Sequence, residues 1–403
     1  MSMEKNVPEI RFEPFQDRWR ALKIEDLILD EILLPPKDGN HGNIHPTSSD
    51  FVGNGIPFIM ANNVKGGKID VLFCSHIRKE QADTLQKGFS IKGDVLLTHK
   101  GTVGEVAIVP EVDSPYLMLT PQVTYYRVAK PKSLSNEFLA ASFVTEKFQK
   151  KLKEEAGGGT RAYIGITKQR SLELNLPSQL SEQNQIGNFF QQLDGLITKH
   201  QQKHDKLKNI KKALIEKMFP QQDETQPAIR FKGFSGEWVG ENLGRLAKIT
   251  TGTSNREDSG LDGKYTFFDR SEDVRTSDIY LFDCEAVIVA GEGSDFLPKY
   301  FVGKFDLHQR TYAIMNFDSG DSRFLFYYVH LFRKHFLDLA VGSTVKSLRL
   351  PMFQSMYIKH PNLQEQRKVG ALLQIADTLI NQHQTQLTKL NNLKQSFLNK
   401  MFV

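Results

Sequence analysis

The chain has 403 residues, of which 39% are hydrophobic and 25% are charged, and its formal net charge at pH 7 is +5. This length exceeds one typical hydrophobic core, so we expect at least two domains, and no apolar run approaches the roughly 20 residues that a membrane-spanning helix requires. The two cysteines are too few for a cysteine-rich zinc site and argue against a disulfide framework.

The first residues of the chain bear on location and on architecture. They contain no apolar stretch like the core of a secretion signal, so we expect a cytoplasmic protein without a membrane partner. They also carry a motif that returns 219 positions later, since Ile10-Arg11-Phe12, Phe15 and Trp19 match Ile229-Arg230-Phe231, Phe234 and Trp238. A repeated motif of this kind indicates a tandem duplication.

The first domain is expected to occupy residues 1–180 and to mix strands with helices. Short apolar runs with glycine and proline between them predict strands at residues 56–60, 95–98, 106–109 and 123–128, and a helical pattern covers residues 136–155. A second domain at residues 221–362 follows a similar course, with strands around 266–268, 286–290 and 311–314 and a helix over 323–341. Each half is therefore predicted to be a mixed α/β domain.

A glycine-spaced turn follows one predicted strand in each half. Glycine lets backbone N–H groups approach a phosphate closely, and hydroxyl or basic side chains add further donors. We therefore take the turn as a candidate DNA contact, although an ordinary tight turn is the alternative interpretation. Its candidate residues are Thr98, Lys100, Gly101, Thr102 and Gly104 in the first half and Gly291, Gly293 and Ser294 in the second.

Two long helices are expected at residues 181–220 and 363–403, and a proline-bounded linker at residues 220–227 follows the first of them. Residues 182–219 match residues 365–402 without a gap, and apolar residues recur with the heptad period of a coiled coil. About 38 residues at about 1.5 Å each make a rod of about 57 Å, and the simplest partner for its apolar stripe is the other helix. The positions expected to pack are Ile186, Leu193, His200, Leu207 and Leu214, with Val369, Ala376, His383, Leu390 and Phe397 in the second copy.

Basic, amide and aromatic side chains also cluster outside the turns. Arginine and lysine bond guanine edges, glutamine and asparagine bond adenine edges, and any cation bonds a phosphate. We take these clusters as further candidates for DNA contact, the alternative being solvated surface residues. They contain Arg161, Tyr163, Lys168 and Arg170 in the first half and Gln309, Arg310, Lys346 and Arg349 in the second.

Catalytic signatures are missing where an enzyme would need them. The chain has no Asn-Pro-Pro-aromatic motif of an amino-methyltransferase, no Walker phosphate loop and no paired carboxylates with a lysine at nuclease spacing. His200 and His383 share one heptad position, which suggests a polar layer that fixes helix register; a metal site there would need further ligands. No catalytic residue and no metal ligand is therefore assigned.

Taken together, the sequence resembles the specificity subunit of type I restriction-modification enzymes. The resemblance covers nearly the whole chain and rests on the tandem architecture, the repeated entry motif, the glycine turns, and the segments that open the two helices at Pro177 and Pro361. It implies two tandem mixed α/β target-recognition domains, each reading one half of a bipartite DNA site, separated by two long antiparallel coiled-coil helices in a pseudo-twofold arrangement.

The resemblance also implies which partners the chain has. Two methylation subunits would dock on the helical frame, restriction subunits would join them, and S-adenosylmethionine, ATP and Mg would belong to those partners, with no cofactor bound by this chain. One departure is that the second domain is 36 residues shorter and has Glu292 near the position of Lys100. The alternatives are a stand-alone DNA methyltransferase or nuclease, and a coiled-coil scaffold without a nucleic-acid role.

Overall fold

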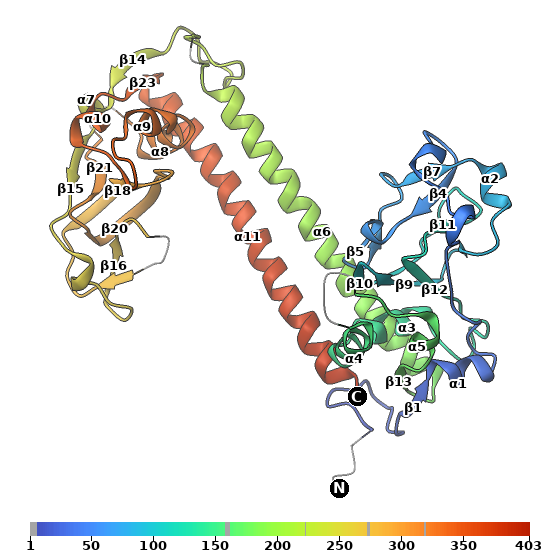
Figure 1. Ribbon diagram of the computed structural model, residues 1–403. Coiled ribbons are helices and arrows are strands. Elements are labelled where there is room, and N and C mark those ends of the chain that lie inside the picture. The colour runs from blue at the N-terminus through green and yellow to red at the C-terminus, as the bar shows by residue number, and fades with distance from the viewer. Residues whose placement is uncertain (1–5, 158–161, 222, 272–274, 318–319) are drawn as a thin grey trace. The chain divides into compact units, whose positions relative to one another are not determined.

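The computed structural model describes residues 6–157, 162–221, 223–271, 275–317 and 320–403. The chain divides into two compact units, unit 1 (Met1–His200 and Gln386–Val403) and unit 2 (Gln201–Thr385). The long helices α6 (Leu180–Met218) and α11 (Leu363–Met401) both cross this division (Figure 1), so each unit holds the start of one helix and the end of the other. The sequence-based domain limits follow the ends of the helices, whereas the compact units divide them.

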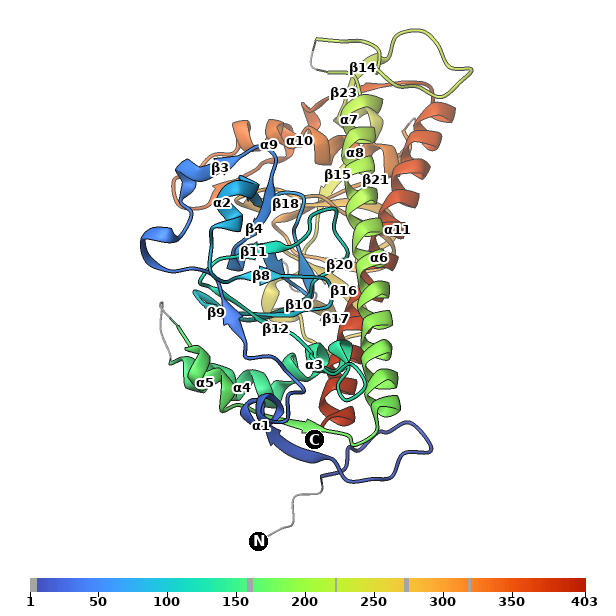
Figure 2. The same cartoon turned by 90° about the vertical axis from the view of Figure 1, so that its right-hand side faces the viewer.

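Unit 1 contains a four-stranded sheet in the order β10-β9-β12-β2, a five-stranded sheet in the order β3-β7-β4-β11-β8, and two small strand pairs. In the view of Figure 2, β4, β8 and β11 lie next to one another. The strands are β1 (Arg20–Lys23), β2 (Lys37–Asp38), β3 (Phe51–Val52), β4 (Ile56–Ile59), β5 (Val64–Lys65), β6 (Lys68–Ile69), β7 (Ser75–Ile77), β8 (Phe89–Ser90), β9 (Val95–Lys100), β10 (Thr102–Ile108), β11 (Leu117–Leu119), β12 (Val123–Tyr126) and β13 (Glu173–Leu176).

The helices of unit 1, besides the ends of α6 and α11, are α1 (Ile24–Leu29), α2 (Lys79–Asp83), α3 (Asn136–Phe143), α4 (Glu146–Ala156) and α5 (Ile166–Arg170). The single helix expected over residues 136–155 is thus two helices. Thr145 explains the break, because its extended backbone and its hydroxyl, which accepts the N–H of Phe148, cap a new helix start.

Unit 2 is built on a six-stranded sheet in the order β15-β21-β18-β20-β16-β17. Its strands are β14 (Val239–Asn242), β15 (Lys248–Thr251), β16 (Tyr265–Phe268), β17 (Arg275–Ser277), β18 (Phe282–Ala290), β19 (Glu292–Gly293), β20 (Lys299–Leu307), β21 (Thr311–Met315), β22 (Lys346–Ser347) and β23 (Tyr357–His360). Its shorter helices are α7 (Leu243–Leu246), α8 (Ser322–Leu331), α9 (Lys334–Leu339) and α10 (Leu350–Gln354), so the helix expected over 323–341 is also divided in two.

The central strand of each unit is buried on both faces. In β9, Val95 and Leu97 pack into the core that includes the long helices, while Leu96 packs into a second core on the opposite face. In β18, Val287 and Val289 pack into the core that includes the long helices, and Ala286 and Ile288 pack into a second core on the opposite face. Burial on both faces explains why these strands read as continuous apolar runs.

Strand register shows that the two units share one framework. β9 pairs with β12 so that Thr98 lies opposite Val123, and β18 pairs with β21 so that Ala290 lies opposite Thr311. Each unit also has a parallel strand pair at the equivalent place, β4 with β11 in unit 1 and β16 with β20 in unit 2. Just beyond these pairs, the N–H of Thr120 donates to the carbonyl of Ile59 (3.0 Å), and the N–H of His308 donates to the carbonyl of Phe268 (2.9 Å). Thr98 is therefore equivalent to Ala290, and Thr120 to His308.

The repeated entry motifs are tied to the helix starts by buried ion pairs. In unit 1, Arg11 donates two hydrogen bonds to the Glu182 carboxylate, at 2.6 and 2.8 Å. In unit 2, Arg230 makes the same fork to Glu365, at 2.7 and 2.8 Å. Both glutamates are almost fully buried, so a charged partner is required at each site. These contacts explain why the arginine and the glutamate occur at equivalent positions in both halves of the sequence.

The long helices are antiparallel within each unit. In unit 1 the Asp194 carboxylate near the start of α6 accepts a bond from Lys394 near the end of α11, at 2.6 Å. In unit 2 the repeat-equivalent Asp377 of α11 accepts a bond from Lys211 of α6, at 2.5 Å. The same pair thus occurs once in each unit with the roles of the helices exchanged, which confirms the expected antiparallel pairing.

The heptad positions are covered unevenly. Ile186, Leu193, Val369 and Ala376 are buried, whereas His200, Leu207, Leu214, His383, Leu390 and Phe397 are half-buried. Four flanking apolar residues stay exposed, at 38–47% of their surface: Leu196, Ile210, Leu379 and Leu393. The pairing of the two helices therefore buries the heptad positions fully or partly, and it leaves these four neighbouring apolar residues exposed to solvent. Among the described residues, no helix has the length and apolar character needed to cross a membrane.

The helix glycines allow a test of how tightly the frame packs. A Cβ added at Gly187 would lie 2.7 Å from the backbone N of Phe138, whereas one at Gly195 on the same helix would meet nothing within 4 Å. We expect Gly187→Ala to destabilise unit 1 by about 1–3 kcal/mol through overpacking, and Gly195→Ala to stabilise the exposed helix by up to about 1 kcal/mol. Urea unfolding midpoints measure both, and equal shifts in the two variants would contradict the packing.

Candidate nucleic-acid interface

Three backbone segments meet at the predicted turn of unit 1. The N–H of His99 donates to Gln122 (2.9 Å), the N–H of Ile164 donates to His99 (3.1 Å), and the N–H of Gly101 donates to Ala162 (3.2 Å). This junction brings the exposed Lys100, Gly101 and Thr102 beside Tyr163, which is 49% exposed and lies opposite Lys100 in an isolated bridge. A turn, a cation and an aromatic ring from distant parts of the sequence therefore share one surface.

Two of the residues predicted for this turn, Thr98 and Gly104, make structural contacts inside the unit. Thr98 is fully buried, and its hydroxyl accepts the N–H of Glu105 at 2.9 Å, so burial removes Thr98 from the exposed surface on which it was expected. The Gly104 carbonyl accepts a bond from Gln149 at 2.8 Å, and a Cβ at Gly104 would lie 2.3 Å from the Gln149 Oε1. By contrast Gly101, with φ of 79°, faces open space.

His99 lies directly beneath the junction. It is 1% exposed, its Nδ1 lies 2.5 Å from the Thr124 hydroxyl, and its Nε2 lies 3.1 Å from the Pro121 carbonyl oxygen. Its ring packs edge-on against Tyr163 with centroids 5.8 Å apart. Burial lowers the pKa of His99 from 6.5 to about 4, even though Asp38 nearby acts in the opposite direction. The imidazole is therefore neutral at physiological pH. It supports the turn from below through its hydrogen bonds and its contact with the Tyr163 ring.

The depressed pKa of His99 makes a prediction about pH. The unfolded chain takes up a proton near pH 6.5, but the folded chain does so only near pH 4, so this group's stability contribution is complete above pH 6.5 and is lost as pH falls to about 4. The loss amounts to about 3 kcal/mol. NMR titration of His99 measures the folded pKa directly, and a value near 6.5 would contradict the buried placement. A His99→Gln variant is expected to lose less stability over the same interval.

The other candidates of unit 1 lie elsewhere or are already paired. Lys168 lies 3.5 Å from Glu155, and Arg170 donates to both carboxylate oxygens of Glu25 on α1. This ion pair holds Arg170 against α1 and not at the turn. Arg161 lies outside the described residues.

Unit 2 has the same three-segment junction. The N–H of Gly291 donates to Arg310 (2.8 Å), and the N–H of Leu348 donates to Gly291 (2.7 Å). β19 pairs with β22 so that Gly293 lies opposite Lys346. The junction therefore brings together Gly291, Gly293, Gln309, Arg310 and Lys346, and the exposed Ser294 and Arg349 directly follow its segments in the chain.

A cavity opens beside each junction. The cavity in unit 1 has a volume of about 490 Å³, and that in unit 2 about 290 Å³. Strand register makes them equivalent, since Lys100 corresponds to Glu292, Thr120 to His308, and Gln122 to Arg310. The linings that carry chemistry are His41, His45, Met60, Lys100, Thr120 and Gln122 in unit 1, and Arg256, Asp269, Arg270, Glu292, His308, Gln309 and Arg310 in unit 2.

The sequence missed most of these lining residues. Gln309, Arg310 and Lys100 were predicted, but His41, Met60, Arg256 and Asp269 come from loops that no local motif marks. Aligning the two turns of the chain with each other would have pointed to residues 120–122, because residues 308–310 occupy the equivalent place.

The cavity of unit 2 is lined by paired charges. Glu292 is hydrogen bonded to Arg310 and lies 3.5 Å from Arg270, and Asp269 accepts a bond from Arg256 at 2.8 Å. Burial would raise the pKa of Asp269, but hydrogen bonds from Ser271 and the nearby Arg256 hold it below its usual value. Burial lowers the pKa of His308. Asp269 thus stays ionised, and the two carboxylates orient the guanidinium groups that pair with them.

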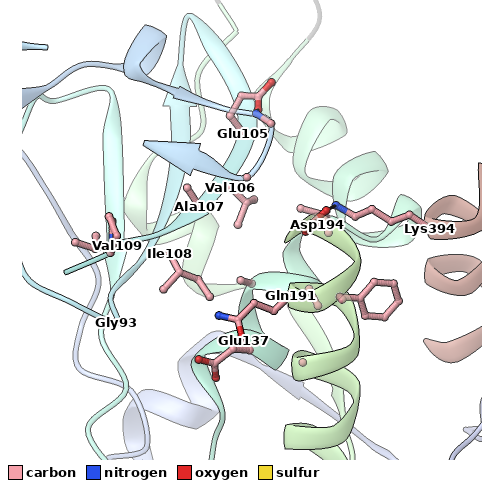
Figure 3. Close-up of a pocket in the computed structure, with 18 of the residues that line it drawn as sticks. Gly93, Glu105, Val106, Ala107, Ile108, Val109, Glu137, Gln191, Asp194 and Lys394 are labelled. Carbon is pink, nitrogen blue, oxygen red and sulfur yellow. Dashed lines mark hydrogen bonds and ion pairs between the residues drawn. The ribbon is translucent and has the colours of Figure 1, made fainter. Parts of the chain in front are cut away.

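Another cavity of unit 1 lies away from the junction, with a volume of about 590 Å³ (Figure 3). It is lined by β10, α3 and the start of α6, and the Asp194–Lys394 ion pair lies at its edge. Its Glu105 accepts the N–H of Gly66 at 2.9 Å. These groups are engaged in structural contacts, so the candidate interface remains the pair of junctions.

A family model for the type I restriction modification DNA specificity domain matches residues 37–209 and again residues 236–392. The chain belongs to this family. The two matched segments contain the two junctions, so the duplication seen in the hydrogen bonds corresponds to two copies of the specificity domain. Members of the family are specificity subunits, and the tandem copies fit recognition of a bipartite DNA site.

Individual relatives agree with the family. The type I restriction enzyme EcoDI specificity subunit of Escherichia coli is 31% identical over 159 residues, which are 40% of this chain and 35% of that relative. A Methanocaldococcus jannaschii protein, provisionally named as the MjaX type I restriction enzyme specificity subunit, is 22% identical over 98% of this chain and 95% of its own length. The crystal structure of the type I restriction-modification S subunit from M. genitalium shares the fold, with a TM-score of 0.72 at 15% identity over 98% of this chain and 99% of that one.

Proposed function

We propose that this chain is the DNA-recognition subunit of a type I restriction-modification complex. Unit 1 reads one half of a bipartite, asymmetric site and unit 2 reads the other. One observation carries the proposal: the same junction and cavity occur in both units, yet their linings differ in chemistry. Equivalent frames with unlike surfaces are what two different half-sites require.

The chemistry of the complex belongs, in this proposal, to its partners. Two methylation subunits dock on the helical frame and supply adenine methylation with S-adenosylmethionine, and restriction subunits supply ATP- and Mg-dependent cleavage. This chain positions the DNA and binds no cofactor of its own. Its place is with the genome in the cytoplasm. The junction cations Lys100 and Lys346 supply the salt-dependent part of the affinity.

The long helices provide the link between the two half-sites. A helix rises about 1.5 Å per residue, so its length is a defined distance and not a flexible tether. We propose that the helix pair sets the spacer between the half-sites, because α6 and α11 each belong to both units.

Selection from a library of random DNA duplexes tests this function. The chain, assembled with its methylation subunits, is expected to enrich a split sequence with a fixed spacer, and binding should weaken steeply as salt rises. A continuous motif, or no enrichment at all, would contradict the proposal. Methylation or cleavage by the purified chain alone, with S-adenosylmethionine or Mg, would instead favour an enzyme.

A further inference from the structure

The residue at the mouth of each cavity occupies one equivalent position in the two units. The carbonyl of Gln122 accepts the N–H of His99 at 2.9 Å, and the carbonyl of Arg310 accepts the N–H of Gly291 at 2.8 Å. Each residue directly precedes the strand that pairs with the central strand of its sheet. The backbone therefore presents Gln122 and Arg310 in the same way, and only their side chains differ.

The surroundings of Arg310 favour a base edge over a phosphate. Its side chain is 63% exposed, and the largely buried Glu292 carboxylate, 16% exposed, holds the guanidinium through Nη1. The remaining N–H groups can form the two-bond contact that guanine O6 and N7 accept. Glu292 and Asp269 line the same cavity and are paired with its arginines, which reduces the positive charge available to a phosphate, and their oxygens can accept a bond from the cytosine amino group.

The surroundings of Gln122 are different. Met60, Phe58 and Pro121 make its cavity partly apolar, and an amide side chain carries both the donor and the acceptor that adenine N7 and N6 require. Thr120 also lines this cavity; it is 4% exposed, and its buried hydroxyl has no hydrogen-bond partner in the described part of the chain. This hydroxyl can therefore bond a polar atom of a base, or a water molecule, in the cavity.

We propose that Gln122 and Arg310 are equivalent specificity-determining residues, with Gln122 reading an adenine in the half-site of unit 1 and Arg310 reading a guanine in the half-site of unit 2. The inference rests on the proposed function and names the base that each cavity reads. Apolar contact of Met60 with the thymine methyl group would add to the reading by unit 1.

Exchange of the two side chains tests the inference in the assembled complex with its methylation subunits. We expect Arg310→Gln to change one position of one half-site from guanine to adenine, and Gln122→Arg to change one position of the other half-site from adenine to guanine. A bidentate base contact of about 1–3 kcal/mol corresponds to about a 5- to 150-fold change in relative affinity between the two bases. Selection from a random duplex library, followed by competition binding, measures it.

Two further variants separate base reading from charge. Arg245→Gln removes an exposed arginine of unit 2, 77% exposed, that lies outside the cavity, and it should leave both half-sites unchanged. Arg310→Lys keeps the charge but loses the planar fork, so guanine preference should fall while the salt dependence stays.

The outcomes distinguish this inference from the proposed function. If the wild-type complex selects a bipartite site but Arg310→Gln and Gln122→Arg keep its base preferences, the inference is wrong and the function stands. A uniform loss of affinity across all sequences in Arg310→Gln, with a reduced salt slope, would assign Arg310 to a phosphate and also overturn the inference. If the wild-type complex selects no sequence, the proposed function itself fails.

Discussion

Replacing Glu182 by alanine is expected to lower the free energy of unfolding of unit 1 by about 3–5 kcal/mol. Glu182 is 1% exposed and accepts three hydrogen bonds, two from Arg11 and one from the Trp19 indole at 3.2 Å. Its loss leaves the Arg11 guanidinium, itself only 10% exposed, without a counter-charge. The repeated motif at residues 10–19 and the start of α6 would then lose the contact that joins them.

The equivalent variant of unit 2 provides an internal comparison. Glu365 accepts the same fork from Arg230, but the buried Trp238 indole N–H has no hydrogen-bond partner among the described residues. We therefore expect Glu365→Ala to destabilise unit 2 less than Glu182→Ala destabilises unit 1.

Tryptophan fluorescence can follow each unit separately, since the chain has two tryptophans, Trp19 in unit 1 and Trp238 in unit 2. Glu111→Ala removes an exposed pair with Lys92 and serves as the control, with no expected effect. Unfolding midpoints in urea that are the same for Glu182→Ala and Glu111→Ala would contradict a structural role of the ion pair.

Lengthening both long helices by one heptad is expected to change the DNA spacer. Seven residues inserted between Gln202 and Lys203, and seven between Thr385 and Gln386, lie at repeat-equivalent points and preserve the heptad phase. The added rise is about 10.5 Å, which corresponds to about three base pairs at about 3.4 Å each.

The readout is the spacer of the sequence selected from a random duplex library by the assembled complex. We expect it to increase by about three base pairs while both half-sites keep their bases, because the insertion leaves the junctions untouched. Insertion into α6 alone is the control. It makes one helix of the pair longer than the other, so it should weaken binding. An unchanged spacer after insertion in both helices would refute the proposal that the helix pair sets it.

Much of the frame can be predicted from the sequence, because the frame is what the two halves share. A gapless repeat and a heptad period are enough to identify α6 and α11 to within a few residues. The repeated Arg11 and Arg230, and Glu182 and Glu365, match because each pair makes the same buried contact. The breaks at Thr145 and after α8 were missed, since helix periodicity continues across a cap.

The interface was predicted only in part. Lys100 and Tyr163, or Gly293 and Lys346, are brought opposite each other by strand pairing between segments far apart in the chain, which no local pattern encodes. Burial also distinguishes neighbours that look alike in the sequence, since Thr98 is enclosed and Thr102 is exposed. Whether a polar residue faces a cavity depends on strand register, and that becomes known only with the fold.

The central claim, that two units read two half-sites independently, is tested most directly by exchanging one of them. Residues 21–180 are replaced by the matching domain of a relative, and methylated adenines are mapped across the genome of cells that carry the methylation subunits. The account predicts that the half-site read by unit 1 changes to that of the relative, while the other half-site stays as it is. A change in both half-sites, or in neither, would contradict it.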